Sequence, residues 1–162
     1  MRKLRLLTSI ACLVAATSAN ALEASLPSQL VSLLARGSCP FFITDAFDTR
    51  VNGDGTVTNF VIPKGEVLVV TDVSIVRNAA GLTPGGTAQA QLVIGTVAHP
   101  GLVFAENITV GTSGAITVHA TFPTGIVVKQ GSIICPVARD LTGSSTNLTA
   151  GGTLHGFLTA DH

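Results

Sequence analysis

The stretch AQAQLVI, residues 88–94, decides the fold class, because its small or apolar side chains alternate with mostly polar ones. A second stretch, ITVHATF at residues 116–122, alternates in the same way. A period of two places one set of side chains on one face of an extended chain, which is typical of half-buried antiparallel strands. A third stretch, VLVVTDVSI at residues 67–75, has the same pattern with an interruption at Thr71. Its expected apolar face consists of Val67, Val69, Val73 and Ile75.

Turn signals separate these strands. Each contains glycine: Asn52-Gly53, Asp54-Gly55, Pro63-Lys64-Gly65, Pro84-Gly85-Gly86, Pro100-Gly101, Ser113-Gly114 and Gly151-Gly152. Many short strands with such spacing are typical of a β-sandwich or barrel. No helical pattern alternates with the strands, which argues against a doubly wound sheet. We therefore predict an all-β protein with an antiparallel, jelly-roll-like β-sandwich over residues 41–162.

A weak internal repeat and a resemblance support this fold. The segment VIPKGEVL at residues 61–68 aligns with VVKQGSII at residues 127–134, and each reads as an apolar pair, a polar turn with glycine and a second apolar pair. Residues 60–75, 124–135 and 154–158 resemble small secreted bacterial β-sandwich proteins of jelly-roll type, most of them uncharacterised. The resemblance implies a fold and carries no catalytic residues across.

Residues 1–21 have the organisation of a secretory signal peptide. A basic start precedes a short apolar run, and Ala19-Asn20-Ala21 is a small-x-small cleavage site. The apolar run is shorter than the roughly 20 residues of a membrane span. A lipid anchor on Cys12 is disfavoured because the residues before it fit a lipoprotein signal poorly. We expect cleavage after Ala21 and secretion to the periplasm or the extracellular space.

The chain that remains after cleavage is weakly acidic. Three of the nine Lys and Arg residues lie in residues 1–21, whereas all nine Asp and Glu residues follow them, so the net charge becomes −3. Nucleic-acid binding and anionic-lipid binding both depend on clustered basic residues. We therefore expect no nucleic-acid partner and no binding to an anionic-lipid surface. The shortness of the apolar run predicts no membrane span.

Cys39 and Cys135 are the two cysteines that follow the signal peptide. An even pair in an oxidising compartment predicts a disulfide. The alternative is two free thiols in a redox or metal site, but no CxxC spacing and no histidine close in sequence accompany either cysteine. The disulfide is the favoured interpretation.

Residues 26–36, LPSQLVSLLAR, predict a short helix. Pro27 suits a first helical turn, and Gly37 suits the position just past the end. The leucines that fall on one helical face are Leu26, Leu30, Leu33 and Leu34. We assign residues 22–40 to this helix and a linker. The helix would cover a sheet edge or, alternatively, dock a partner subunit.

The stretch RVNGDG, which begins at Arg50, reads in part like a calcium loop. Asn52, Asp54 and Gly55 suit the third, fifth and sixth positions of such a loop. Its first and last ligand positions, however, hold Arg50 and Val61, which cannot coordinate calcium through their side chains. Asn-Gly and Asp-Gly steps predict a tight hairpin turn instead.

Other chemistry is sparse in the sequence. Asp45, Asp48 and Asp54 are weak candidates for a calcium site of a different kind, formed between loops. The histidines lack HxH and HExxH spacing, and no serine lies in a GxSxG motif. We assign no catalytic residue, no cofactor and no enzymatic activity.

Two functions remain for such a chain. The first is a secreted, non-enzymatic structural or interaction protein of the cell envelope or extracellular space, with an unidentified protein or cell-surface partner or with itself. The alternative is a sandwich module that binds a small ligand, a glycan or calcium through loops at one end. The polar segment of residues 139–152 is a candidate binding loop in that alternative.

Overall fold

The computed structural model describes residues 29–42, 44–78, 81–143 and 147–162. This part of the chain forms ten strands. They are β1 (Leu30–Ser38), β2 (Asp45–Val51), β3 (Val57–Asn59), β4 (Glu66–Arg77), β5 (Thr87–Thr96), β6 (His99–Thr109), β7 (Ile116–Lys129), β8 (Ile133–Asp140), β9 (Asn147–Thr149) and β10 (Gly151–Ala160). The predicted signal peptide, residues 1–21, lies outside the described residues.

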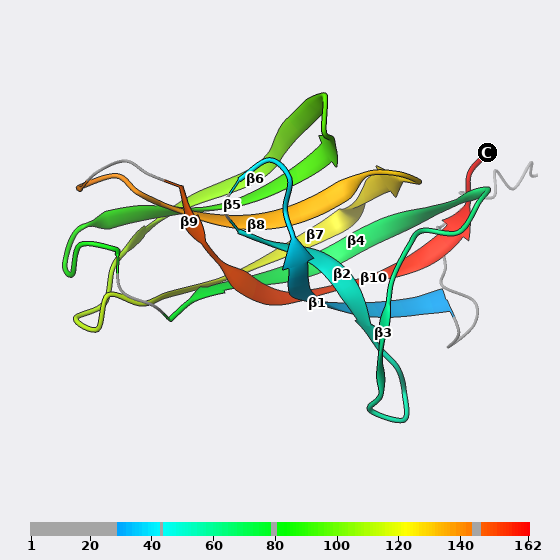
Figure 1. The fold of residues 1–162 in the computed structure, drawn as a ribbon, viewed down its shortest axis with the longest axis horizontal. Coiled ribbons are helices and arrows are strands. Elements are labelled where there is room, and N and C mark those ends of the chain that lie inside the picture. Colours follow the sequence, from blue (N-terminus) through cyan, green and yellow to red (C-terminus); the bar gives the residue numbers. More distant parts are fainter. Residues whose placement is uncertain (1–28, 43, 79–80, 144–146) are drawn as a thin grey trace, which may run out of the picture.

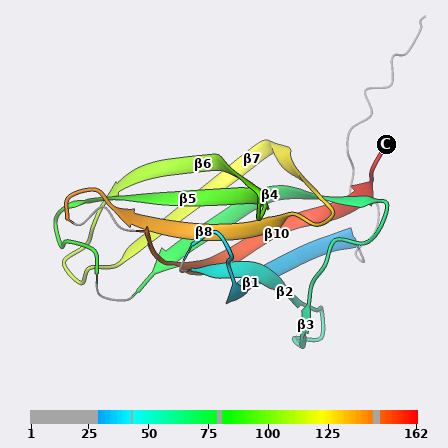
Figure 2. The same ribbon diagram turned by 45° about the horizontal axis from the view of Figure 1, so that its top comes forward.

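The strands form two antiparallel sheets that pack face to face (Figures 1 and 2). One sheet has six strands in the order β3-β2-β1-β10-β4-β7, and the other has four in the order β6-β5-β8-β9. The chain crosses between the sheets from β4 to β5, from β6 to β7, from β7 to β8 and from β9 to β10, and the first and last strands pair with each other. Such crossings are typical of jelly-roll-like sandwiches. The all-β, two-sheet prediction is confirmed.

Alternating side chains fill the space between the sheets. In β5, Ala88, Ala90 and Leu92 are fully buried in the core. In β7, Ile116 and Val118 are buried in the same cluster. The period-two prediction for these two strands is therefore confirmed, and burial of their apolar faces is the main favourable term in folding.

In β4 the predicted apolar face is wrong in its first half. Leu68 and Val70 point into the core there, whereas Val69 belongs to the outer face. Against β10, Val70 pairs with Gly156 and Asp72 with His155, so Thr71 is one extra residue in β4, a β-bulge. A bulge inserts one extra residue and moves the following side chains to the opposite face. The prediction therefore holds only beyond the bulge, for Val73 and Ile75.

The predicted helix of residues 26–36 is wrong for residues 30–36, which belong to β1. Residues 26–28 lie outside the described part. Val31 and Leu33 are buried, and their neighbours are more exposed, so the burial has a period of two. Strand β1 pairs with β10 on one side and β2 on the other. These two ladders satisfy its backbone groups and override the helical spacing of the leucines. The six-stranded sheet therefore starts before residue 41.

The hairpin predicted around residues 52–55 is confirmed. It connects β2 to β3, the Asn52 amide donates to the Thr56 carbonyl at 2.9 Å, and Gly55 has a φ of 83°. The hairpin projects from the body of the sandwich (Figure 1). Two other turn signals are wrong, because Pro100-Gly101 lies within β6 and Gly151-Gly152 lies within β10.

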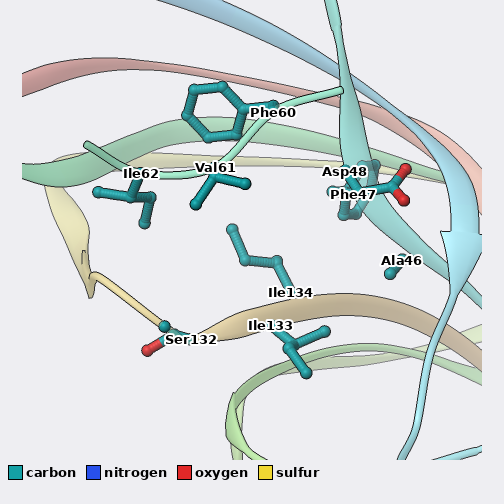
Figure 3. A pocket seen from close by; sticks show the side chains of 10 residues that line it. Ala46, Phe47, Asp48, Phe60, Val61, Ile62, Ser132, Ile133 and Ile134 are labelled. Carbon is teal, nitrogen blue, oxygen red and sulfur yellow. The ribbon is translucent and has the colours of Figure 1, made fainter. Parts of the chain in front are cut away.

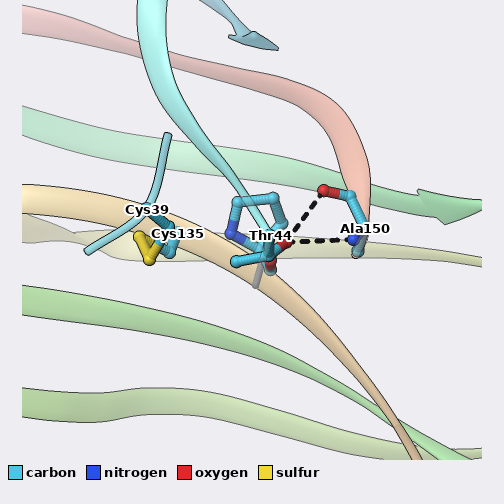
Figure 4. Close-up of a disulfide and its surroundings, with 5 residues drawn as sticks. Cys39, Thr44, Cys135 and Ala150 are labelled. Atoms are coloured by element: carbon cyan, nitrogen blue, oxygen red, sulfur yellow. Dashed lines mark hydrogen bonds between the residues drawn. A yellow bond between two sulfur atoms is a disulfide. The ribbon is translucent and has the colours of Figure 1, made fainter. Parts of the chain in front are cut away.

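The predicted disulfide is confirmed, and it joins the two sheets. Cys39 lies just after β1, Cys135 lies in β8, and their Cα atoms are 6.0 Å apart (Figure 4). Beside the disulfide, the buried Thr44 hydroxyl donates to the Pro136 carbonyl at 2.7 Å and accepts from the Ala150 amide at 3.0 Å. The segment between β1 and β2 is thus held against the four-stranded sheet at this side of the sandwich.

Candidate interaction surface

The three weak calcium candidates lie at different places on the β2–β3 hairpin. Asp45 and Asp48 belong to β2, and Asp54 lies in the turn. The Asp54 carboxylate accepts hydrogen bonds from the hydroxyl and the amide of Thr56, and these bonds lower the pKa of Asp54. Within the described residues, no three His, Cys, Asp or Glu side chains gather as a metal site would require. The structure therefore does not bring these acids together.

Asp140, in the predicted 139–152 loop, has a structural role. Its carboxylate accepts hydrogen bonds from the amides of Gly143 and Thr142 and from the amide and hydroxyl of Thr83, all between 2.8 and 2.9 Å. The Gly143 amide and then the Thr83 hydroxyl contribute most to lowering the pKa of Asp140 to about 2. Asp140 thereby ties the end of β8 to the β4–β5 connection.

Part of the predicted loop is not a loop. Residues 147–149 form β9, which pairs with β8, and β10 begins at Gly151. Residues 144–146 lie outside the described residues. The candidate binding loop is therefore reduced to a short connection, of which the described portion is held by Asp140.

The outer face of the six-stranded sheet carries an apolar row that sequence reasoning missed. Leu30 of β1 lies opposite Phe157 of β10, Phe157 lies opposite Val69 of β4, and Val69 lies opposite Val127 of β7. We call Leu30, Phe157, Val69 and Val127 the apolar row. These residues are direct cross-strand neighbours in four adjacent strands. Their side chains share one face because the residues that flank them in each strand, such as Val31 and Val128, point into the core.

The ends of the apolar row are open to solvent. Leu30 is 57% exposed and Val127 is 55% exposed, whereas Val69 in the middle is buried. Gly125, with a φ of 70°, lies against Val69, because a Cβ there would lie 2.3 Å from a Val69 methyl group. Gly125 belongs to residues 122–125 of β7, which the register shift leaves without a partner in β4. This stretch covers the centre of the row and leaves its ends free.

A polar row runs beside the apolar row. His155 of β10 lies between Ser32 of β1 and Asp72 of β4 in the sheet register. The Ser32 hydroxyl oxygen is 2.8 Å from His155 Nδ1. Sequence reasoning missed this pair as well, because 123 residues separate its members and neither lies in a motif. The pair is exposed on the sheet face, and it forms a hydrophilic border to the apolar row.

The comparisons with known proteins give little beyond this description. No family model matches the chain, and no curated protein matches it. Among solved structures, the chain is similar to the globular domain of the zebrafish complement 1qA protein, at 15% identity and a TM-score of 0.39. The similarity covers 83% of this chain and 98% of that one. The assignment of the two-sheet sandwich rests on the strand pairings themselves.

The disulfide bears on the compartment in which the protein works. The Cys39–Cys135 disulfide is typical of proteins that fold in an oxidising environment, such as the periplasm or the cell exterior. The described residues contain no helix that is long and apolar enough to cross a membrane.

Proposed function

We propose that the protein is a secreted, non-enzymatic structural or interaction protein of the cell envelope or extracellular space. It acts through the outer face of its six-stranded sheet. The observation that supports this proposal is the apolar row, which extends across four strands and exposes leucine and valine at its two ends. Exposed apolar patches with a polar border mark protein-interaction sites.

The partner that we propose for this face is a second copy of the chain. The row contains no charged residue, so two copies can approach without like-charge repulsion at the centre of the contact. The two exposed ends of the row, Leu30 and Val127, are both apolar, so a copy rotated by 180° can place its Val127 against Leu30 of the first and its Leu30 against Val127. Such a self-complementary contact is the usual basis of a two-fold dimer. The Ser32–His155 row would lie at the rim, where polar groups stay hydrated.

The test compares two glutamate substitutions in the exported full chain. Val127→Glu places a charge at the end of the apolar row, and Val97→Glu places the same charge in the β5–β6 turn of the other sheet. The two valines are 55% and 68% exposed, so neither substitution buries a charge in the isolated chain. We expect light scattering coupled to size exclusion to report a dimer for the parent and for Val97→Glu, and a monomer for Val127→Glu.

A parent chain that stays monomeric up to millimolar concentration would rule out the second copy as the partner. Equal dimer dissociation constants for the two variants would rule out this face of the six-stranded sheet as the dimer contact. The mass of the exported chain checks the first part of the proposal separately, because secretion with a cleaved leader predicts a chain that begins at Leu22.

A further inference from the structure

A second apolar feature lies at one end of the sandwich, apart from the apolar row. It is a cavity of about 240 Å³ between β2, the β3–β4 connection and the β7–β8 turn (Figure 3). The side chains that form most of its wall are Ala46, Phe60, Val61, Ile62, Ile133 and Ile134. Both copies of the internal repeat contribute to this wall. Val61 and Ile62 begin the first copy, and Gly131 to Ile134 end the second.

Among the described residues that line the cavity, Asp48 is the one with a charged side chain, and its carboxylate points elsewhere. Figure 3 shows the Asp48 carboxylate pointing away from Val61 and Ile134. It lies over Gly37 of β1, where a Cβ would come within 1.7 Å of Asp48 Oδ2. A side chain at position 37 would therefore displace the carboxylate. Glycine there lets the charge stay outside the cavity, and the wall that a ligand meets is mostly apolar, with Ser132 at its rim.

We infer that this cavity binds a small amphiphile with an aliphatic body and one uncharged polar end. Its volume holds about eight non-hydrogen atoms at the roughly 30 Å³ that a water molecule occupies in the liquid. That is larger than a cavity of about 150 Å³ that takes up benzene, and smaller than the pockets of about 300 Å³ or more that hold drug-sized ligands. The polar end faces solvent at the mouth, because the wall offers no charge to pair with it.

The inference does not rest on the proposed function. No residue of the apolar row lines the cavity. A chain that fails to dimerise can still bind the amphiphile, and a dimer can form without it, so the two experiments fail separately.

The absence of Trp and Tyr from the chain makes a single-tryptophan reporter possible. Val61→Trp places the fluorophore at the mouth of the cavity, where Val61 is 75% exposed. Leu141→Trp is the control, because Leu141 is 39% exposed and follows the end of β8 that lies farthest from Ile133. Each full-length reporter is titrated with 1-butanol, 1-hexanol, 1-octanol and 1-decanol while its emission is recorded.

We expect saturable changes in Val61→Trp alone. The affinity should rise about fourfold for each added methylene, the ratio that corresponds to burying one CH₂, and should level off near 1-octanol when the cavity is full. Adding Ser132→Phe, which places a ring at the cavity rim, should lower the affinity at least tenfold. Ser113→Phe, in the β6–β7 turn, is the control for that change.

Binding can also be measured on the wild-type chain, in which no substitution has altered the cavity. In its amide spectrum, 1-octanol should shift the resonances of residues 46–48, 60–62 and 131–134 and leave the other strands unchanged. If these amide resonances show no saturable shift up to the solubility limit of 1-octanol, the inference is overturned. The cavity would then be a candidate site for a side chain of a partner protein. Equal responses of the two tryptophan reporters, or an affinity that keeps rising through 1-decanol, also overturn it.

Discussion

The two long sides of the sandwich are closed in different ways. Along the β2–β8 side, the sheets are joined by the Cys39–Cys135 bond and by the buried hydroxyl of Thr44. Along the β6–β7 side, two edge strands approach each other, and the contact is the ring of Phe104 against the ring of Phe122. The ring centroids are 5.9 Å apart in an edge-to-face arrangement.

The difference shows how one fold divides its stability between covalent, polar and dispersion terms. The disulfide side fixes two segments that are 96 residues apart in the chain, so it acts mainly on the unfolded ensemble. The aromatic side acts only in the folded state and can open without breaking a covalent bond. We expect the β6–β7 side to separate first when the protein is destabilised.

Removing the disulfide should have the largest effect. Chain-entropy models give a loop of about a hundred residues a stabilisation of roughly 4–5 kcal/mol, so the Cys39→Ala, Cys135→Ala double variant should lose about that free energy of unfolding. Urea unfolding measures it. The control is dithiothreitol, which should destabilise the parent to the same extent and leave the double variant unchanged. Equal urea midpoints for parent and double variant would contradict this view of the closed side.

Removing the aromatic contact should cost less. Phe104 and Phe122 are only partly buried, so Phe122→Ala should destabilise by about 2–3 kcal/mol, at or below the lower end of the range for fully buried phenylalanine. A double-mutant cycle with Phe104→Ala isolates the ring pair, and we expect a coupling of about 0.5–1.5 kcal/mol. Strict additivity of the two substitutions would show that the rings contribute burial and no specific contact.

The same comparison explains what the sequence could and could not predict. Cysteine count and the Asn-Gly and Asp-Gly steps are local or compositional signals, and the disulfide and the hairpin that they predict are both present. The apolar row depends on the registers of three strand pairs, and the bulge in β4 sets which valines face outward. Neither register nor bulge position is encoded in a local pattern, so the candidate surface could not be predicted.

The failed helix prediction has a related cause. The leucines of residues 30–36 fit a helical stripe, yet Val31 and Leu33 also fit a strand. A segment of this length satisfies both periods, and only the neighbouring strands β10 and β2 decide between them. Tertiary pairing therefore determined an element whose local pattern was ambiguous.

Replacing Thr44 tests the polar link on the disulfide side. Thr44→Val keeps the shape of the side chain and leaves the Ala150 amide and the Pro136 carbonyl without this partner. We expect a loss of about 1–2 kcal/mol, within the range for unsatisfied buried groups. Thr44→Ser retains the hydroxyl and should recover most of the stability in the same urea titration. If Thr44→Ser were as unstable as Thr44→Val, the missing methyl group and not the hydrogen bond would be responsible.

The smallest effect near neutral pH should come from a third link, which lies at the end of β8. Its hydrogen bonds hold the pKa of Asp140 near 2, below its ordinary value of 3.8, so the folded state favours the ionised form. A lowered carboxylate pKa contributes stability that is fully present above about pH 4 and is lost as the pH falls towards 2.

Urea midpoints of the parent should therefore decrease between pH 4 and pH 2, and Asp140→Asn should flatten this decrease while lowering the midpoint at pH 7. Glu66→Gln, at the half-buried first residue of β4, is the matched control for the loss of one carboxylate elsewhere in the chain. A slope that persists in Asp140→Asn would place the acid sensitivity elsewhere, and the end of β8 would then be held by hydrogen-bond geometry and not by charge.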